Sequence, residues 1–402
     1  MTAWLTIIGI GEDGWEGLAP IARSVVEDAD WIVGGERHLA FLPDMKGQQI
    51  QWESPFKKSF DRIKELEGEK VVVLATGNPM WFGVGASLKR AFPEFDMRII
   101  PASSAYSLAA ARMNWSIPDI ECLTVHSRPL DSVRAFLRPD ARLIILSRDG
   151  CTPSQLSAFL TNSGYGGSEM TVLSQLGGPA EARIEGTAES WRNDTVSDLN
   201  IIALHCIAGE GAVVLGRTPG LPDDAFVHDG QLTKREVRAV TLSVLQPMPG
   251  QLLWDVGAGC GSVSIEWMRA AANTRAVAIE NNARRCELIE ENALALGVPE
   301  LELVKGEATA LLSNLKSPDA VYIGGGLTSG NLIATCWNSL NPYGRLVVNA
   351  VTFEGERLLA EAMEEYGGEL VRLEISRNQS MGRFQGWQPF KPVTQWRINK
   401  IE

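Results

Sequence analysis

The sequence lacks any close pairing of cysteines or histidines. Its 6 cysteines and 4 histidines are scattered over 402 residues, with no C-x-x-C and no H-E-x-x-H motif. These absences argue against a disulfide framework and against a zinc site of the usual spacing, so we expect no bound metal.

Long apolar runs and an excess of basic residues are also missing. No stretch approaches the roughly 18 apolar residues of a membrane span, and the opening MTAWLTIIGIGEDG has no basic residue before its short apolar run. We therefore expect a cytoplasmic protein without a membrane partner. The 37 Lys and Arg against 49 Asp and Glu leave a net charge of −12, which would repel a phosphate backbone and argues against nucleic acid.

What is present is a long alternation of apolar strands and amphipathic helices. A chain of 402 residues with 45% hydrophobic residues is long enough for two or three folded domains. Buried strands separated by helices predict an α/β fold with largely parallel sheets. Shorter helices and more strand from about residue 119 to 206 suggest a second lobe. The predicted strands are 5–11, 31–35, 70–77, 97–102, 121–127, 141–147, 169–175 and 200–206.

A Gly-, Pro- and Asp-rich stretch at 209–231 interrupts this alternation, and we place the domain boundary there. The division is 1–208, a linker at 209–224, and 225–402. After it a helix is predicted at 233–245, where Thr233 and Glu236 have capping-box spacing. The strand-like tail near the C-terminus predicts late strands that pair at a sheet edge.

The clearest motif is a glycine turn between a strand and a helix. The strand LLWDV, which contains Asp255, runs into Gly257, Gly259 and Gly261, and the next strand ends in Glu280. Such a turn brings backbone amides close to a ligand, and Glu280 is placed to accept the hydroxyls of a ribose. The G-x-G-x-G spacing is typical of S-adenosylmethionine (SAM) enzymes, although an NAD site and a purely structural turn remain alternatives.

The C-terminal part also resembles a known family. GQLTKREVRAVTLSVLQP, LLWDVGAGCGSVSIEWM, PDAVYIGGGL and RNQSMGRFQGWQPFKPVTQW are similar to the class I SAM-dependent methyltransferase domain that methylates C15 and decarboxylates in corrin biosynthesis. This resemblance implies a Rossmann-like fold. Together with the glycine turn, it implies a SAM site that includes Thr233, Asp255, Gly257, Gly259, Gly261, Glu280, Glu307, Ala308 and Gly324.

The N-terminal part carries three glycine- or serine-rich turns after predicted strands: GIGEDG, ATGNPMWFG and IPASSAYSLAAARM. Their order resembles the two-lobed tetrapyrrole methylase family, and IVGGERHL and LTVHSRP resemble its C5-methylating branch. The family's G-D-P is Gly77-Asn78-Pro79 here and its P-G-x-S begins Pro101-Ala102, so this chain lacks the charge of the family's aspartate and carries a slightly bulkier residue in place of its glycine. The resemblance implies a second SAM site with Gly77, Asn78, Pro79, Gly83, Ser103 and Ser104.

The two resemblances on one chain imply a bifunctional enzyme of cobalamin biosynthesis. It would methylate a precorrin at C5 and C15 with two SAM and decarboxylate the ring C acetate. No nucleophile or further cofactor is expected, because an enamine-like meso carbon needs chiefly orientation. The alternatives are a tetrapyrrole-binding NAD(P)-dependent oxidoreductase and a binding module with a vestigial SAM site. We also expect a homo-oligomer.

An anionic substrate requires local cations on this acidic chain, and arginine binds carboxylates well. Each cation could equally belong to a solvated surface. We expect Trp387 and Trp396 to pack in a core. The candidate cations are Lys234, Arg235, Arg238, Arg377 and Arg383 in the C-terminal part, and Arg37, His38, Arg112, His126 and Arg128 in the N-terminal part.

Overall fold

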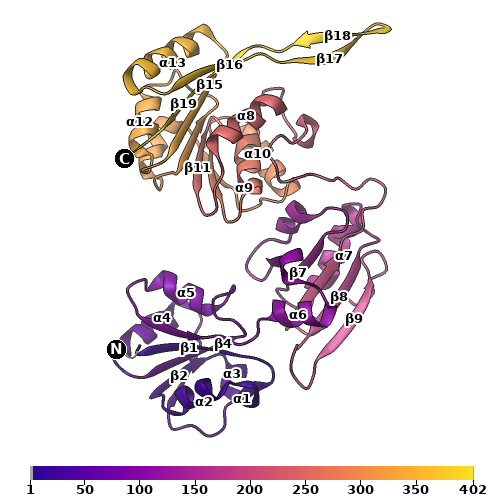
Figure 1. Cartoon of the computed structure of the whole chain (residues 1–402), viewed down its shortest axis with the longest axis vertical. Coiled ribbons are helices and arrows are strands. Elements are labelled where there is room, and N and C mark those ends of the chain that lie inside the picture. The colour runs from indigo at the N-terminus through magenta and orange to yellow at the C-terminus, as the bar shows by residue number, and fades with distance from the viewer. Residues whose placement is uncertain (1–2, 402) are drawn as a thin grey trace. The chain divides into compact units, whose positions relative to one another are not determined.

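The structure is a computed structural model that describes residues 3–401. The chain folds into two compact units, shown from indigo to yellow in Figure 1. The N-terminal unit holds the chain up to Arg128 together with Arg138–Val213. The C-terminal unit holds Pro129–Leu137 and the chain from Val214 onward.

The first sheet of the N-terminal unit is parallel throughout, with the order β3-β2-β4-β1-β5. Every side chain of β1 is buried, because alternate residues such as Ile7 and Ile8 enter cores on opposite faces of the sheet. The elements are β1 (Leu5–Ile10), α1 (Gly14–Gly17), α2 (Pro20–Glu27), β2 (Trp31–Gly34), α3 (Glu36–Ala40), β3 (Gln48–Gln51), α4 (Lys57–Glu65), β4 (Val71–Thr76), α5 (Val84–Ala91) and β5 (Met97–Ile100).

A second sheet of the same unit has the order β6-β7-β10-β8-β9 and is mostly antiparallel, with only β6 and β7 parallel. The expected change toward more strand after residue 119 is confirmed. The elements from residue 105 to 205 are α6 (Ala105–Met113), η1 (Ile117–Asp119), β6 (Glu121–Thr124), η2 (Leu130–Phe136), β7 (Arg142–Leu146), α7 (Thr152–Asn162), β8 (Glu169–Ser174), β9 (Ala182–Thr187) and β10 (Asn200–His205).

The C-terminal unit is built on a seven-stranded sheet with the order β13-β12-β11-β14-β15-β19-β16. The first five strands are parallel, and β19 runs antiparallel to both of its neighbours. The late strands therefore pair at a sheet edge, as predicted. The strands are β11 (Leu252–Val256), β12 (Arg275–Glu280), β13 (Glu302–Lys305), β14 (Ala320–Ile323), β15 (Arg345–Ala350), β16 (Glu369–Leu373) and β19 (Val393–Asn399).

Helices cover both faces of this sheet, and neighbouring residues of β11 enter different cores. Leu253 packs with residues of α8 and α9, while Trp254 packs with residues of α12 and α13. The strand order reverses between β11 and β14, the point at which open α/β sheets bind ligands. The helices are η3 (Asp223–Ala225), α8 (Arg235–Leu245), α9 (Ser262–Ala270), α10 (Ala283–Ala295), α11 (Ala308–Leu311), η4 (Leu312–Asn314), α12 (Leu332–Ser339) and α13 (Phe353–Tyr366).

Two expectations about the C-terminal unit were wrong. Lys234, not Thr233, is the N-cap of α8, and its side chain has no acceptor that could cap the helix. Glu236, expected to complete a capping box, instead accepts from Arg377. Trp387 is 76% exposed on the hairpin of β17 (Ser376–Met381) and β18 (Phe384–Pro389), which Figure 1 shows projecting from the sheet. Trp396, in contrast, is fully buried, as expected.

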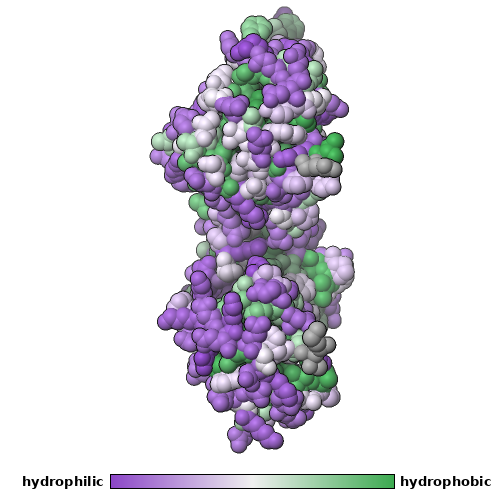
Figure 2. All heavy atoms as spheres, turned by 90° about the vertical axis from the view of Figure 1, so that its left-hand side faces the viewer, coloured by the Kyte–Doolittle hydropathy of each residue, from purple (hydrophilic) through white to green (hydrophobic). Residues whose placement is uncertain are grey.

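The segment expected to link the two domains packs in part against the C-terminal unit. Leu221 is 4% exposed in a core with residues of α9 and α10, and the Arg217 side chain donates to the carbonyl of Arg269 at 2.8 Å. Figure 2 shows a face on which hydrophilic residues predominate and hydrophobic residues are scattered. Within residues 3–401, no helix has the length and apolar character needed to cross a membrane.

Candidate active site

The glycine turn that follows β11 needs its glycines for different physical reasons. Gly257, Gly259 and Gly261 all have positive φ, between 61° and 81°, a region that other residues rarely adopt. A Cβ on Gly257 would lie 2.7 Å from the Gly325 backbone, so this glycine allows the β11 and β14 turns to approach. A Cβ on Gly261 would instead meet Ile289 and Ile265, which gives this glycine a packing role.

A cavity of about 700 Å³ lies at the carboxyl edge of the sheet, around this turn. Its volume is in the range of small-molecule sites. Residues from five parallel strands and their turns line it, and Leu373, Ile375, Phe390, Lys391 and Val393 form another part of its wall. The predicted residues that line it are Thr233, Gly257, Gly259, Glu280, Glu307, Ala308 and Gly324.

Glu280 is fixed at the end of β12 by backbone amides. Its Oε2 accepts from the Gly259 amide at 2.8 Å, and its Oε1 accepts from Asn281 and Asn282 at 3.1 and 3.0 Å. The side chain is 4% exposed, yet it lines the cavity. Oε1 already accepts two bonds and Oε2 only one, so the remaining acceptor capacity lies on Oε2 and suits a ligand hydroxyl.

Asp255 lies beneath the turn and does not line the cavity. Its Oδ2 accepts from the amide and hydroxyl of Ser264 at 3.0 and 2.6 Å, while Oδ1 is buried without a hydrogen-bond partner. Burial raises the pKa of this carboxyl to about 6, and the nearby Glu280 adds to the shift. An unpaired acceptor beside the glycine turn fits a cofactor that is a cation, as SAM is.

Sequence reasoning missed several residues that line this cavity. Tyr322 at the end of β14 and Asn349 at the end of β15 are among them, together with Phe390 and Lys391. Both strand-end residues could have been found, because the carboxyl ends of parallel strands meet at one edge. Phe390 and Lys391 follow a hairpin that the sequence did not reveal.

The N-terminal unit has a smaller cavity of about 50 Å³, lined by residues of both its sheets. Of the predicted SAM residues, Gly77 and Ser103 line it, whereas Asn78, Pro79, Gly83 and Ser104 do not. Gly77 has a φ of 58°, and a Cβ on it would lie 2.9 Å from the Ser103 carbonyl oxygen.

The two departures from the tetrapyrrole methylase pattern fit the local backbone. Asn78 Oδ1 accepts from the Met80 amide at 3.0 Å, a turn contact that an aspartate could also make. Ala102 is absent from the positive-φ residues, and its amide donates to the Gly77 carbonyl at 3.1 Å. Ser104 caps α6, since its hydroxyl accepts from the Ser107 amide at 3.1 Å.

Known proteins match the chain over its whole length. Residues 4–191 match the tetrapyrrole (corrin/porphyrin) methylases, and residues 224–400 match the precorrin methyltransferase domain. A precorrin-6Y C(5,15)-methyltransferase [decarboxylating] of Sinorhizobium sp is 43% identical over 401 residues, which cover 100% of this chain and 97% of that relative. The chain belongs to the precorrin-6Y C5,15-methyltransferase (decarboxylating) family.

Membership in the precorrin-6Y C5,15-methyltransferase family fixes the activity as SAM-dependent methylation with decarboxylation in cobalamin biosynthesis. The oxidoreductase alternative was therefore wrong. A probable cobalt-precorrin-6B C(15)-methyltransferase (decarboxylating) of Saccharolobus solfataricus is 35% identical over 164 residues, 39% of this chain and 81% of that relative. The solved C-terminal domain of the Rhodobacter capsulatus enzyme is 44% identical, with a TM-score of 0.44, over 46% of this chain and 100% of that domain.

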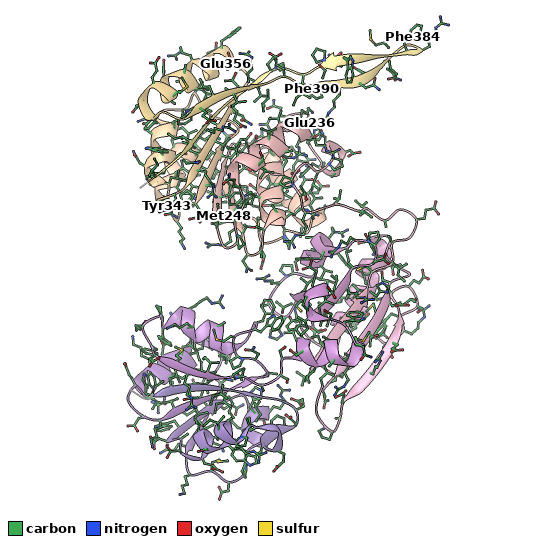
Figure 3. The ribbon with its side chains drawn as sticks, in the orientation of Figure 1. Glu236, Met248, Tyr343, Glu356, Phe384 and Phe390 are labelled. Atoms are coloured by element: carbon green, nitrogen blue, oxygen red, sulfur yellow. The ribbon has the colours of Figure 1, made fainter. Side chains whose placement is uncertain are left out.

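The candidate substrate cations of the C-terminal unit differ in whether they line the cavity. Lys234 lines the cavity of this precorrin-6Y C5,15-methyltransferase, whereas Arg235 does not. Arg383, in the hairpin turn, lies over the ring of Phe384 at 5.1 Å. Figure 3 labels Phe384 at the far end of the hairpin and Phe390 at its base.

Two of these arginines form ion pairs within the C-terminal unit, so their assignment to substrate stays a prediction that these contacts weaken. Arg238 is fully buried, with its Nε 2.5 Å from Glu266. Arg377 lies in β17 rather than in a loop and donates to Glu236 at 2.6 Å and to Asp223 at 2.7 Å. Glu236, followed by Asp223, raises the pKa of Arg377, so its guanidinium stays charged and these two carboxylates balance that charge.

Two of the N-terminal candidate cations also form ion pairs within the chain. Arg37 pairs with Glu12 and donates to Thr76, and Arg112 binds both oxygens of Glu181 at 2.5 and 2.9 Å. Burial, with a further contribution from Arg37, lowers the pKa of His38 to about 4. A neutral imidazole supplies no charge near neutral pH, so this shift argues against His38 as a cation for carboxylates.

The last two N-terminal candidates, His126 and Arg128, follow β6. His126 is exposed, and Arg128 lies over the ring of Phe82 at 5.9 Å. Neither residue lines the small cavity of this unit. Their assignment to substrate carboxylates stays a prediction.

Proposed function

We propose that the two activities of the family belong to the two parts of this chain. Residues 1–208 would carry C5 methylation, 225–402 would carry C15 methylation and decarboxylation, and 209–224 would link them. The observation that carries the C-terminal assignment is the cavity where Glu280 meets the glycine turn above Asp255. The relative from Saccharolobus solfataricus supports a separable C15 activity, because its name gives C15 alone.

The strand order gives SAM a direction in this cavity. Glu280 on β12 would hold the ribose hydroxyls, with Glu307 and Ala308 after β13 near the adenine. The methionine end would then cross the β11 turn, above the buried Asp255, whose carboxylate favours a cationic group there through its charge rather than by contact. The transferable methyl would face the turn after β14, which begins at Gly324 and lines the cavity.

The residues of this site bind and orient rather than form a covalent intermediate. A meso carbon of a reduced macrocycle is nucleophilic, so alignment of carbon, methyl and sulfur supplies most of the catalysis. Lys234 and Lys391 line the cavity and would bind substrate carboxylates. Unlike Arg238 and Arg377, these two lysines line the cavity itself.

Mass spectrometry on the full chain tests this function. The enzyme is incubated with its precorrin substrate and isotopically labelled SAM, and the product is analysed for label and for carbon dioxide loss. We expect two labelled methyl groups and one lost carbon dioxide per product. A product with one labelled methyl would contradict activity in both domains.

The C-terminal site should bind SAM more tightly as the pH rises through about 6, because Asp255 then becomes ionised beside a cationic ligand. The contribution of Asp255 to the stability of the free enzyme should instead decrease as the pH rises. The raised pKa stabilises the fold fully below the ordinary aspartate pKa of 3.8, and this contribution is lost as the pH rises through about 6. Calorimetric titration with SAM should show the binding trend, and Asp255→Asn should remove it. An unchanged trend in that variant would contradict the role of Asp255.

We also propose that the chain forms a homo-oligomer through the β17–β18 hairpin. Both edges of this two-stranded sheet are unpaired within residues 3–401, and Met381, Phe384 and Trp387 are 65 to 76% exposed. A second copy offers the same edges and apolar side chains. Light scattering should give a mass above that of one chain, and Phe384→Ser with Trp387→Ser should lower it. A monomeric wild-type protein would contradict the proposal.

A further inference from the structure

The substrate side of the C-terminal cavity is defined by the strand order. Glu280, which would hold the ribose, lies on β12, on one side of the central strand β11. The strands on the other side of β11 are β14 and β15, and these would face the precorrin. The polar side chains that these strands bring to the cavity are Tyr322 and Asn349, and Thr233 lies beside them. The proposed binding of the ribose by Glu280 does not require any of these three residues.

A buried hydrogen-bond chain reaches the cavity at Tyr322. Gln395 Nε2 donates to Asn349 Oδ1 at 2.9 Å, which leaves the Asn349 amide nitrogen as the donor toward β14. That nitrogen donates to Thr241 at 3.1 Å and to the Tyr322 hydroxyl at 3.2 Å. The Tyr322 oxygen therefore accepts from Asn349, and its own proton points toward Thr233, 3.3 Å away, or toward the cavity.

The phenol of Tyr322 is held in place by its surroundings. The residue is 3% exposed and packs in the core against α8 and α9, while its ring edge lies beside Gly324. A Cβ on Gly324 would come within 2.8 Å of the ring. Burial raises the pKa of Tyr322 to about 12, so the hydroxyl carries its proton at neutral pH.

We propose that Tyr322 is the catalytic residue that donates a proton to the side-chain carbon that loses carbon dioxide. This inference rests on the proposed C15 and decarboxylation site. The support is a fixed, protonated hydroxyl on the substrate side of the cavity, with an amide donor behind it. After proton transfer, the Asn349 amide would stabilise the tyrosinate oxygen.

The step balances without any oxidant or reductant. The bond between the acetate methylene and its carboxylate breaks, carbon dioxide leaves, and the electron pair moves into the conjugated macrocycle. The pair then returns to the methylene carbon, which takes the Tyr322 proton and becomes a methyl group. Tyrosinate recovers a proton from water.

The test is Tyr322→Phe in the full-length enzyme, assayed in D₂O with labelled SAM. General acid catalysis contributes about 10²-fold or more, so formation of the new deuterated methyl group should slow by that order. SAM affinity by calorimetry should stay at the wild-type value. The matched control is Tyr366→Phe, since Tyr366 packs against Trp337 and Trp396 and does not line the cavity.

A second variant keeps the inference testable if Tyr322→Phe does not fold. Asn349→Asp places a carboxylate against the phenol oxygen, which disfavours tyrosinate and should also slow formation of the deuterated methyl group. Wild-type rates of decarboxylation and deuterium uptake in a folded Tyr322→Phe enzyme would overturn the inference. The proposed function would then still stand if Glu280→Gln abolished C15 methylation.

Discussion

Glu280→Gln should abolish C15 methylation while C5 methylation continues. Glutamine keeps the shape of the side chain, but its amide nitrogen would face backbone N–H groups that now donate to a carboxylate, from Gly259 on one side and Asn281 and Asn282 on the other. It would also lose the charged acceptor for the ribose. A hydrogen bond to a charged group contributes about 1.5–3 kcal/mol, so its loss should cost about 10- to 10²-fold in SAM affinity, and the clash with the backbone N–H groups adds to this loss.

The measurement is the position of labelled methyl groups in the product, with calorimetry for SAM binding. Glu287→Gln is the matched control, because Glu287 is an exposed carboxylate on α10 that pairs with Arg284 at 2.7 Å. The reciprocal variant is Gly77→Val, which forces a Cβ against the Ser103 carbonyl and should remove C5 methylation alone. Loss of both methylations in Glu280→Gln, or of neither, would show that the site is wrongly placed.

The parts of the site that could be predicted from the sequence are those set by local chain geometry. A strand, a glycine turn and a helix follow one another within a few residues, and Glu280 ends the next strand, so their meeting is a property of a parallel sheet. Tyr322 and Asn349 obey the same geometry. They were missed because neither residue type marks a site by itself.

The cations could not be predicted, because their partners are remote in the sequence. The partner of Arg238 is Glu266, and that of Arg377 is Glu236, which lies 141 residues away. An arginine on a helix looks the same in sequence whether it meets substrate or a buried carboxylate. Only the fold decides between these two outcomes.

The missed strands show a similar limit. β3 and β9 are edge strands with mostly exposed or half-buried residues, so they lack the apolar runs by which strands are recognised. The β17–β18 hairpin pairs only with itself, and its burial pattern is almost entirely exposed. Trp387 was misassigned to a core for this reason.

Arg238→Ala should destabilise the C-terminal unit more than any change at its surface. The fully buried guanidinium pairs with Glu266 and Asp223 and donates to the carbonyls of Thr233 and Leu221. Its removal leaves Glu266, itself 1% exposed, without its ion-pair partner. Breaking one partner of a buried ion pair costs about 3–5 kcal/mol. Amide hydrogen exchange of β11 reports the opening free energy of this unit and should fall by that amount.

Two variants separate the buried charge from a general effect of mutation. Arg235→Ala changes an exposed arginine on the same helix and should alter stability by no more than about 0.5 kcal/mol. Arg238→Met combined with Glu266→Gln removes both charges. The Gly220 and Leu221 amides now donate to different oxygens of Glu266, so the single glutamine oxygen can still accept from one of them. The pair should therefore lose less stability than Arg238→Ala alone, because no unpaired charge remains in the core. A double variant at least as unstable as the single one would mean that Arg238 stabilises the unit through packing on Phe226 and carbonyl contacts rather than through its charge.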